Sequence, residues 1–145
     1  MLSPSNVFAQ KAQITGLSDL SFGSISNVTV DAVRNENVCV YANGSNRDYT
    51  VRATGSGSGS AFTLANGSLL LPYEVQWKDS AGQTTGSQLT TNVALANQIT
   101  SASSTTCSSG PAATASLIVI LRASALASAT AGNYSGVLTL TVAPQ

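Results

Sequence analysis

The sequence predicts an all-β domain, either a sandwich or a barrel, and three observations support this fold class. Short stretches rich in β-branched and apolar residues recur about every ten to fifteen residues, separated by glycine, asparagine, serine and aspartate. Several of these stretches alternate apolar and polar residues, as half-buried strands do. Amphipathic helical spacing is almost absent. The 145 residues fit a single domain of ordinary size.

The expected strands follow one another along the chain, and each ends at a turn or a loop. Three of the turns are marked by Asn43-Gly44, Asn66-Gly67 and Ala81-Gly82, because these pairs contain residues that tolerate a positive φ. The expected strands are 12–22, 28–33, 37–42, 49–54, 61–65, 72–78, 89–93, 115–122 and 134–142.

Two of these strands identify side chains that face the core. In each strand an apolar residue at every second position alternates with a polar or charged one. Because successive side chains of a strand point to opposite faces of the sheet, we expect the apolar sets to be buried. These sets are Tyr49, Val51 and Ala53, and Tyr73, Val75 and Trp77.

The segment 117–121 is apolar at every position, which predicts a central strand covered on both faces. The alanine-rich segment 123–131 follows it. Alanine has the highest helix propensity, so a short helix is conceivable there. The interleaved serine and threonine, and the turn at Gly132-Asn133, favour a loop instead.

The charge balance excludes several classes of function. Only 8% of the residues are charged, and six basic side chains balance six acidic ones. Such a surface cannot displace counterions along a nucleic acid, so we expect no nucleic-acid partner. The longest strongly apolar run, 117–121, is far shorter than the roughly 20 residues of a membrane-spanning helix. We expect no membrane span.

The sequence offers little catalytic chemistry. It contains no histidine that could activate a nucleophile or bind zinc, and its six carboxylates form no recognisable pair. The Gly-Ser segment 55–60 lacks the lysine and the strand-to-helix context of a phosphate-binding loop. Aspartate and asparagine residues do not cluster at the spacing of a calcium loop. We therefore expect no enzyme activity, no catalytic residue, no metal and no cofactor.

The two cysteines, Cys39 and Cys107, are expected to form a disulfide. Closing a loop of about 68 residues would stabilise the fold by roughly 4 kcal/mol in the chain-entropy model. The alternative is two reduced, buried cysteines in a cytosolic protein. Low charge and a high content of serine, threonine and asparagine favour an extracytoplasmic compartment and thus the disulfide.

The N-terminus supports export. Residues 1–9 resemble the cleavage end of a secretory signal, with Val7 and Ala9 at the positions before the cut. The apolar middle and the basic start of a signal are missing, so we interpret Met1 as the start of a truncated sequence. We expect residues 1–9 to be a residual signal-peptide end and residues 10–145 to form the domain.

Four segments, taken in order, carry a resemblance to a known family. They are Leu20-Ser21-Phe22-Gly23-Ser24-Ile25, with an L-x-F-G element; Val38-Cys39-Val40-Tyr41-Ala42-Asn43-Gly44, with a cysteine in the second strand; Leu71-Pro72-Tyr73-Glu74-Val75-Gln76-Trp77-Lys78-Asp79; and Ala131-Gly132-Asn133-Tyr134-Ser135-Gly136-Val137-Leu138-Thr139-Leu140-Thr141-Val142. They resemble the spore coat protein U family, whose domains also form the subunits of archaic chaperone-usher pili in Gram-negative bacteria. The cysteines depart from the commonest family pattern, which pairs a cysteine near the first strand with the one in the second.

The resemblance implies an immunoglobulin-like β-sandwich that lacks its last strand and is completed by a donor strand from a neighbouring polypeptide. The sequence agrees at one point, because it stops shortly after a strongly apolar strand whose outer edge then lacks a partner. In the alternative, the first strand, 12–22, closes that edge within the same chain. The expected groove for a donor strand or a chaperone is lined by Ile14, Leu20, Phe22, Leu138, Leu140 and Val142.

The resemblance also implies a function, that of an extracellular structural or adhesive pilus subunit. Its expected partners are a periplasmic chaperone, an outer-membrane usher and neighbouring subunits, and it would pass through the periplasm to the bacterial cell surface. A mid-fibre donor needs roughly ten or more alternating apolar residues before its first strand. Only Gln10 and Lys11 precede Ala12 after the inferred cut, which favours a terminal or tip subunit. The alternative is a stand-alone secreted β-sandwich that binds a ligand outside any pilus.

A tip subunit could present apolar loops to abiotic or host surfaces. Apolar residues next to flexible or polar loop sequence are candidates for this role, although strand residues of this kind also belong to cores. The candidates are Phe62, Leu69, Val93 and Leu95.

Overall fold

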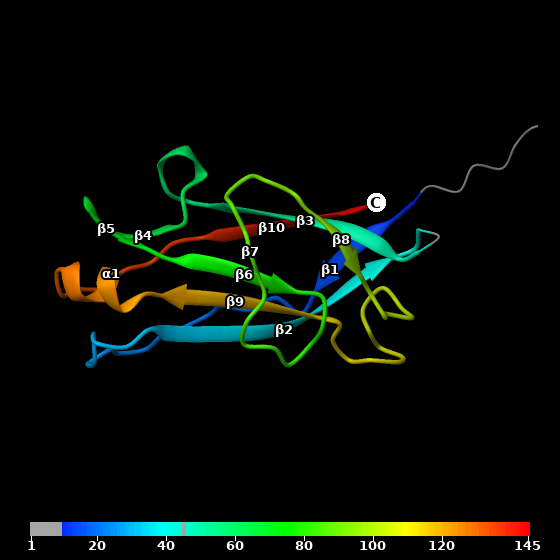
Figure 1. Cartoon of the computed structure of the whole chain (residues 1–145), viewed down its shortest axis with the longest axis horizontal. Coiled ribbons are helices and arrows are strands. Elements are labelled where there is room, and N and C mark those ends of the chain that lie inside the picture. Colours follow the sequence, from blue (N-terminus) through cyan, green and yellow to red (C-terminus); the bar gives the residue numbers. More distant parts are fainter. Residues whose placement is uncertain (1–9, 45) are drawn as a thin grey trace, which may run out of the picture.

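The computed structural model describes residues 10–44 and 46–145, so the expected signal-peptide end, residues 1–9, lies outside the described part. The described chain is an antiparallel β-sandwich with one short α-helix (Figure 1). The predicted all-β fold class is confirmed.

Two sheets and a separate hairpin make up the sandwich. The larger sheet has the order β1 (Ala12–Thr15), β2 (Ala32–Ala42), β9 (Ala115–Leu121), β6 (Glu74–Lys78) and β7 (Ser87–Gln88). The smaller sheet has the order β10 (Leu138–Pro144), β3 (Asp48–Gly55) and β8 (Leu95–Ile99). The hairpin consists of β4 (Thr63–Asn66) and β5 (Leu69–Pro72), a 3-10 turn spans Ser58–Ser60, and the helix α1 spans Ala123–Ser128.

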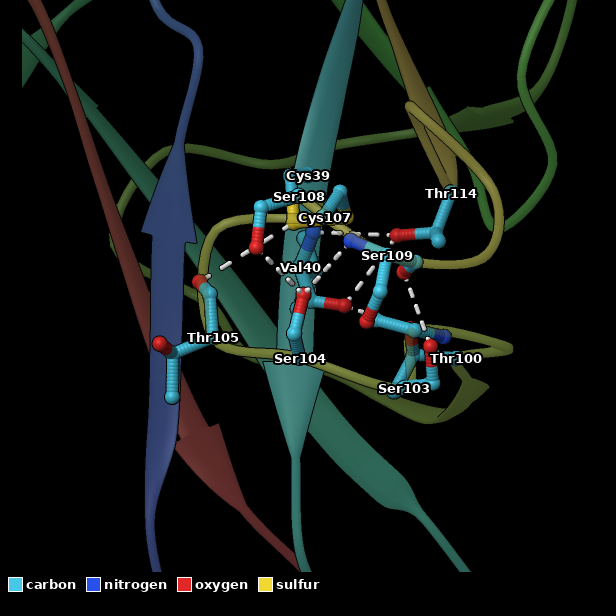
Figure 2. Close-up of a disulfide and its surroundings, with 11 residues drawn as sticks. Cys39, Val40, Thr100, Ser103, Ser104, Thr105, Cys107, Ser108, Ser109 and Thr114 are labelled. Atoms are coloured by element: carbon cyan, nitrogen blue, oxygen red, sulfur yellow. Dashed lines mark hydrogen bonds between the residues drawn. A yellow bond between two sulfur atoms is a disulfide. The ribbon is translucent and has the colours of Figure 1, made fainter.

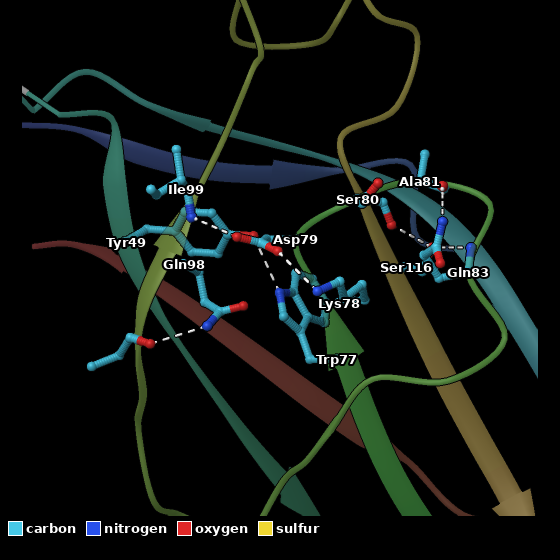
Figure 3. Close-up of polar contacts among 11 residues, drawn as sticks. Tyr49, Trp77, Lys78, Asp79, Ser80, Ala81, Gln83, Gln98, Ile99 and Ser116 are labelled. Atoms are coloured by element: carbon cyan, nitrogen blue, oxygen red, sulfur yellow. Dashed lines mark hydrogen bonds and ion pairs between the residues drawn. The ribbon is translucent and has the colours of Figure 1, made fainter.

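The two predicted core sets are confirmed. Tyr49, Val51 and Ala53 on β3 are fully buried, as are Val75 and Trp77 on β6, with Tyr73 nearly so. The indole Nε1 of Trp77 donates a hydrogen bond to the Tyr49 hydroxyl at 3.1 Å, and the two rings meet edge to face across the two sheets (Figure 3). This pair fixes the spacing of the sheets at the centre of the core.

The prediction of a central strand at 117–121 is also confirmed. β9 lies in the middle of the five-stranded sheet, and all its residues are buried. One face of β9 contributes to the main core. The loop after β6 is tied to the other face, because the Gln83 backbone N–H donates to the Ser116 hydroxyl and that hydroxyl donates to the Ser80 carbonyl (Figure 3).

The structure corrects several strand boundaries. The first strand ends at Thr15 instead of continuing to residue 22, where Gly16 adopts a φ of 87°, outside the range of an extended strand. The expected strands 28–33 and 37–42 form one continuous strand, β2, that begins at Ala32. The segment 89–93 is a loop between β7 and β8, in which Asn92 has a φ of 60° and donates its N–H to the Ala53 carbonyl.

The expectation of a loop over 123–131 was wrong, since its first part forms α1. The alanine-rich segment has a high helix propensity, and two tertiary contacts stabilise the helix. Leu126 is buried against the core, and Asp31 accepts a hydrogen bond from the Ala123 N–H, which has no partner within the helix. This hydrogen bond and the Arg122 guanidinium hold the pKa of Asp31 below its usual value. Arg122 also pairs with Glu74, so it joins the start of β6 to the start of α1.

The predicted disulfide between Cys39 and Cys107 is confirmed (Figure 2). It fastens the loop between β8 and β9 to β2, with the two Cα atoms 5.9 Å apart. Thr100 and Thr114 lie at the two ends of this loop, and both hydroxyls donate to the Val40 carbonyl. The Val40 N–H in turn donates to the Thr114 hydroxyl at 3.0 Å. The loop is therefore anchored to one strand by a covalent bond and by polar contacts.

We expect Tyr49→Phe to lower the free energy of unfolding by about 1–3 kcal/mol, because the Trp77 N–H would be left buried without an acceptor. Burial raises the pKa of Tyr49 in the folded state. The stability linked to this phenol is therefore present below its unfolded pKa of about 10 and is lost as the pH rises above that value. Urea unfolding at pH 7 and at about pH 11 measures both effects.

The variant should lose less stability than the wild type between the two pH values. Tyr41→Phe is the control. Among the described residues the Tyr41 hydroxyl has no hydrogen-bond partner, and its ring is half-buried against the two bonded cysteines. A Tyr49→Phe variant as stable as the Tyr41→Phe variant at pH 7 would contradict the role assigned to the Trp77 contact.

Candidate functional site

A groove of about 990 Å³ opens beside the core between the segment 17–25 and β10. Its floor is formed by residues of β9, the central strand of the larger sheet. The hairpin and α1 lie next to each other at one end of the sandwich (Figure 1). Residues of both line that end of the groove. The apolar residues that line the floor and this end are Leu117, Val119, Leu121, Leu64, Leu71, Tyr73 and Leu126.

β10 forms one wall of the groove. One edge of β10 pairs with β3 along its whole length, from Leu138 opposite Gly55 to Pro144 opposite Tyr49. Within the described chain, no strand pairs with its other edge. The strand alternates, so that Leu138 and Leu140 are half-buried and face the groove, while the threonines between them are exposed. β10 thus presents free backbone groups at its unpaired edge and apolar side chains on the adjoining face that lines the groove.

The segment 17–25 forms the other wall. It comes after β1 and runs beside the first half of β2 without joining a sheet in the described chain (Figure 1). Leu20, Phe22 and Ile25 are half-buried and pack against the core. Side chains of β2 hold the segment instead of a backbone ladder. Arg34 donates to the carbonyls of Ser21 and Phe22, and Glu36 accepts from Ser18.

The structure brings together four of the six residues predicted to line the groove, namely Leu20, Phe22, Leu138 and Leu140. Ile14 on β1 and Val142 on β10 are half-buried and pack against the same core, outside the groove lining. The first strand lies near β10 but does not close its edge, because β1 pairs with β2 and no ladder joins β1 to β10 in the described chain. The groove itself is a feature of the structure; its use by a strand or a chaperone is a proposal.

Sequence reasoning missed the floor of the groove and Glu36. Leu117, Val119 and Leu121 occur at every second position of the apolar run, and this spacing places them on one face. No local signal indicated that this face would lie below an opening. The acidic residue Glu36 also lines the groove, although its polarity suggested exposure.

The four residues predicted for adhesion lie in different environments. Leu69 and Val93 are exposed, Leu69 on β5 and Val93 in the loop before β8. Phe62 is half-buried and stacks on Tyr73, with ring centres 5.6 Å apart, and Leu95 is half-buried against the core.

The described residues contain no group of three or more acidic or cysteine side chains that could hold a metal ion. No helix in the described part of the chain has both the length and the apolar character needed to cross a bilayer. The features that remain as a candidate site are the groove and the free edge beside it.

Comparisons with known proteins show the fold. No protein-family model matches the sequence, and no curated protein does. Among solved structures, the chain is similar to a chain of the chaperone-tip adhesin complex of CFA/I fimbriae, with a TM-score of 0.60 and 20% identity over 92% of this chain and 41% of that one. It is also similar to the P pilus rod subunit PapA, with a TM-score of 0.55 and 16% identity over 93% of this chain and 92% of that one.

The present chain thus spans less than half of the CFA/I chain that it matches and nearly all of PapA. At this level of identity the likeness concerns the fold. The protein has an immunoglobulin-like β-sandwich of the pilin type, with an open groove beside its last strand.

Proposed function

We propose that this protein is an extracellular subunit of a bacterial chaperone-usher pilus and that a strand from a neighbouring polypeptide completes its fold. The observation that carries the proposal is the groove between the segment 17–25 and the free edge of β10. An extended peptide laid along β10 would bond to its free backbone groups and place every second side chain in the groove.

The chemistry of the walls fits such an occupant. Leu20, Phe22, Leu138 and Leu140 are only half-buried when the groove is open. Burying a fully exposed apolar side chain contributes about 1.5–3 kcal/mol, so completing the burial of each of these half-buried side chains contributes roughly half of that. Backbone hydrogen bonds to β10 would add direction and register, because they fix which side chain of the occupant meets which part of the groove.

An uncovered groove next to a free strand edge also promotes aggregation. We therefore propose a periplasmic chaperone that covers the groove before assembly and an outer-membrane usher at which a neighbouring subunit replaces it. The fold shared with PapA and with the CFA/I chain supports these partners. The resemblance of four segments to the spore coat protein U family supports the archaic type of pilus. The protein would reach the cell surface through the periplasm.

We place the subunit at the end of the fibre. The match to a chain from a tip adhesin complex supports this position, and so do exposed apolar side chains that could contact a surface. They include Leu69 and Val93, which were predicted from the sequence, and Leu70, which is 59% exposed. We propose that these residues, rather than the half-buried Phe62 and Leu95, contact a host or abiotic surface.

The test is binding of a synthetic strand to the full chain. The probe is a nine-residue peptide in which valine or leucine alternates with threonine, and the control has the same composition with its apolar residues contiguous. Only the alternating peptide should bind and protect the backbone amides of β10 from hydrogen exchange. At a concentration of about one hundred times its Kd, it should raise the Tm by about 8 °C. Binding of neither peptide would leave the stand-alone secreted β-sandwich as the better interpretation.

A further inference from the structure

Glu36 has a carboxylate oxygen that the open groove does not satisfy. Oε1 accepts hydrogen bonds from the backbone N–H of Ser18, at 2.7 Å, and from the Ser18 hydroxyl. Oε2 is buried and has no hydrogen-bond partner in the described part of the chain. It is the one buried side-chain oxygen or nitrogen in that part that lacks a partner. The residue lines the groove.

An unpartnered carboxylate oxygen is unusual at the position that Glu36 occupies in the sheet. Glu36 lies opposite Leu117 in the register of β2 and β9, and Leu117 belongs to the core and to the groove floor. Val38 and Val40 follow at every second position on the same face of β2, and both are fully buried. A charged side chain on this face loses hydration, and its burial is unfavourable unless hydrogen bonds replace the lost water.

Arg34 lies two residues earlier on the same face of β2, and its charged group, unlike that of Glu36, has hydrogen-bond partners throughout. Its guanidinium donates to the carbonyls of Ser21, Phe22 and Val33 and lies 5.5 Å from the centre of the Phe22 ring. The Arg34 guanidinium therefore has a structural role while the groove is empty, because it holds the segment 17–25 in place. Glu36 needs only one of its two oxygens to hold Ser18, and the second oxygen has no function in the open form.

Oε2 is already buried while the groove is open, so a purely apolar occupant would leave it without a partner, whereas an occupant with a donor that reaches the Glu36 carboxylate would satisfy it. We propose that Glu36 selects the strand that fills the groove: the strand carries apolar residues at its groove-facing positions except one, where a side chain donates a hydrogen bond to Glu36 Oε2. This inference rests on the proposed function, since it names a property of the strand that the groove accepts.

Paired peptides that differ by one hydroxyl group test the proposal. In the alternating nine-residue peptide, each groove-facing position is made threonine in one peptide and valine in its partner, two side chains of the same shape. Binding of each pair to the full chain is measured by fluorescence titration. At one position the threonine peptide should bind about tenfold more tightly or better, as expected for a hydrogen bond to a charged group. At the other positions threonine should weaken binding.

Two variants assign the preference to Glu36. Glu36→Met, which has a similar length and no polar oxygen, should reverse the preference at that position to valine. Glu36→Gln, which keeps an acceptor for Ser18, should reduce it to less than about threefold and serves if the methionine variant does not fold. Asp19→Asn is the control, because Asp19 also lines the groove but is exposed. It removes the same charge and should leave the preference unchanged.

The outcomes separate this inference from the proposed function. Equal binding of threonine and valine peptides at every position would overturn the role of Glu36 and leave strand binding intact. A preference that persists in Glu36→Gln and Glu36→Met would overturn it as well. Failure of all peptides to bind would overturn the proposed function together with this inference.

Discussion

The Leu140→Asp variant is expected to bind the alternating strand peptide at least a hundredfold more weakly than the wild type. Leu140 is half-buried on β10 and faces the groove. An aspartate there would be covered by the occupant without a cation to pair with, and burying an unpaired charge costs several kcal/mol. A loss of about 2.7 kcal/mol already corresponds to a hundredfold change in Kd.

Thr139→Asp is the matched control for this variant. Thr139 is the neighbouring residue of the same strand, and its side chain is exposed on the opposite face. The control introduces the same charge into the same strand, so its affinity should stay within about threefold of the wild type. Circular dichroism and the Tm establish that both variants fold. Wild-type affinity in a folded Leu140→Asp variant would argue against binding of a strand in the groove.

Removing the disulfide is expected to have the largest effect on stability. The bond between Cys39 and Cys107 closes a loop of 68 residues. In the chain-entropy model, the double variant Cys39→Ala/Cys107→Ala should lose about 4 kcal/mol of unfolding free energy. A small domain has a total stability of about 5–15 kcal/mol, so the variant should unfold at a much lower urea concentration.

Two controls accompany this measurement. Reduction of the wild type under non-denaturing conditions should produce a similar loss, because it removes the same covalent link. Ser108→Ala changes an exposed residue next to Cys107 and should alter stability by less than about 0.5 kcal/mol. A loss below about 1 kcal/mol in the double variant would show that Thr100 and Thr114 suffice to hold the loop on β2.

Local sequence determined which side chains form the core. The alternation through Tyr49, Val51 and Ala53 assigns each residue to a face, since the period of a strand is two. The unbroken apolar run over 117–121 marked the central strand for a related reason, because only a strand covered on both faces can be apolar throughout. With just two cysteines in the chain, the disulfide had one possible pairing.

Contacts between distant segments decided the rest. The helix over Ala123–Ser128 depends on Asp31, which lies far away in the sequence and accepts the Ala123 N–H. The wall 17–25 is not a strand, because Gly16 turns the chain out of the ladder and the side chains of Arg34 and Glu36 hold the wall in place.

The residues that line the groove differ in whether local sequence predicts their positions. Its apolar wall on β10 could be predicted, since the alternation of Leu138 and Leu140 is a local pattern. The place of Glu36 could not, because a charged residue in a β-rich segment is expected to face water. Only the pairing of β2 with β9, set by segments about eighty residues apart, turns that side chain toward the core, since ladder partners are chosen by tertiary contacts and not by neighbours in the sequence.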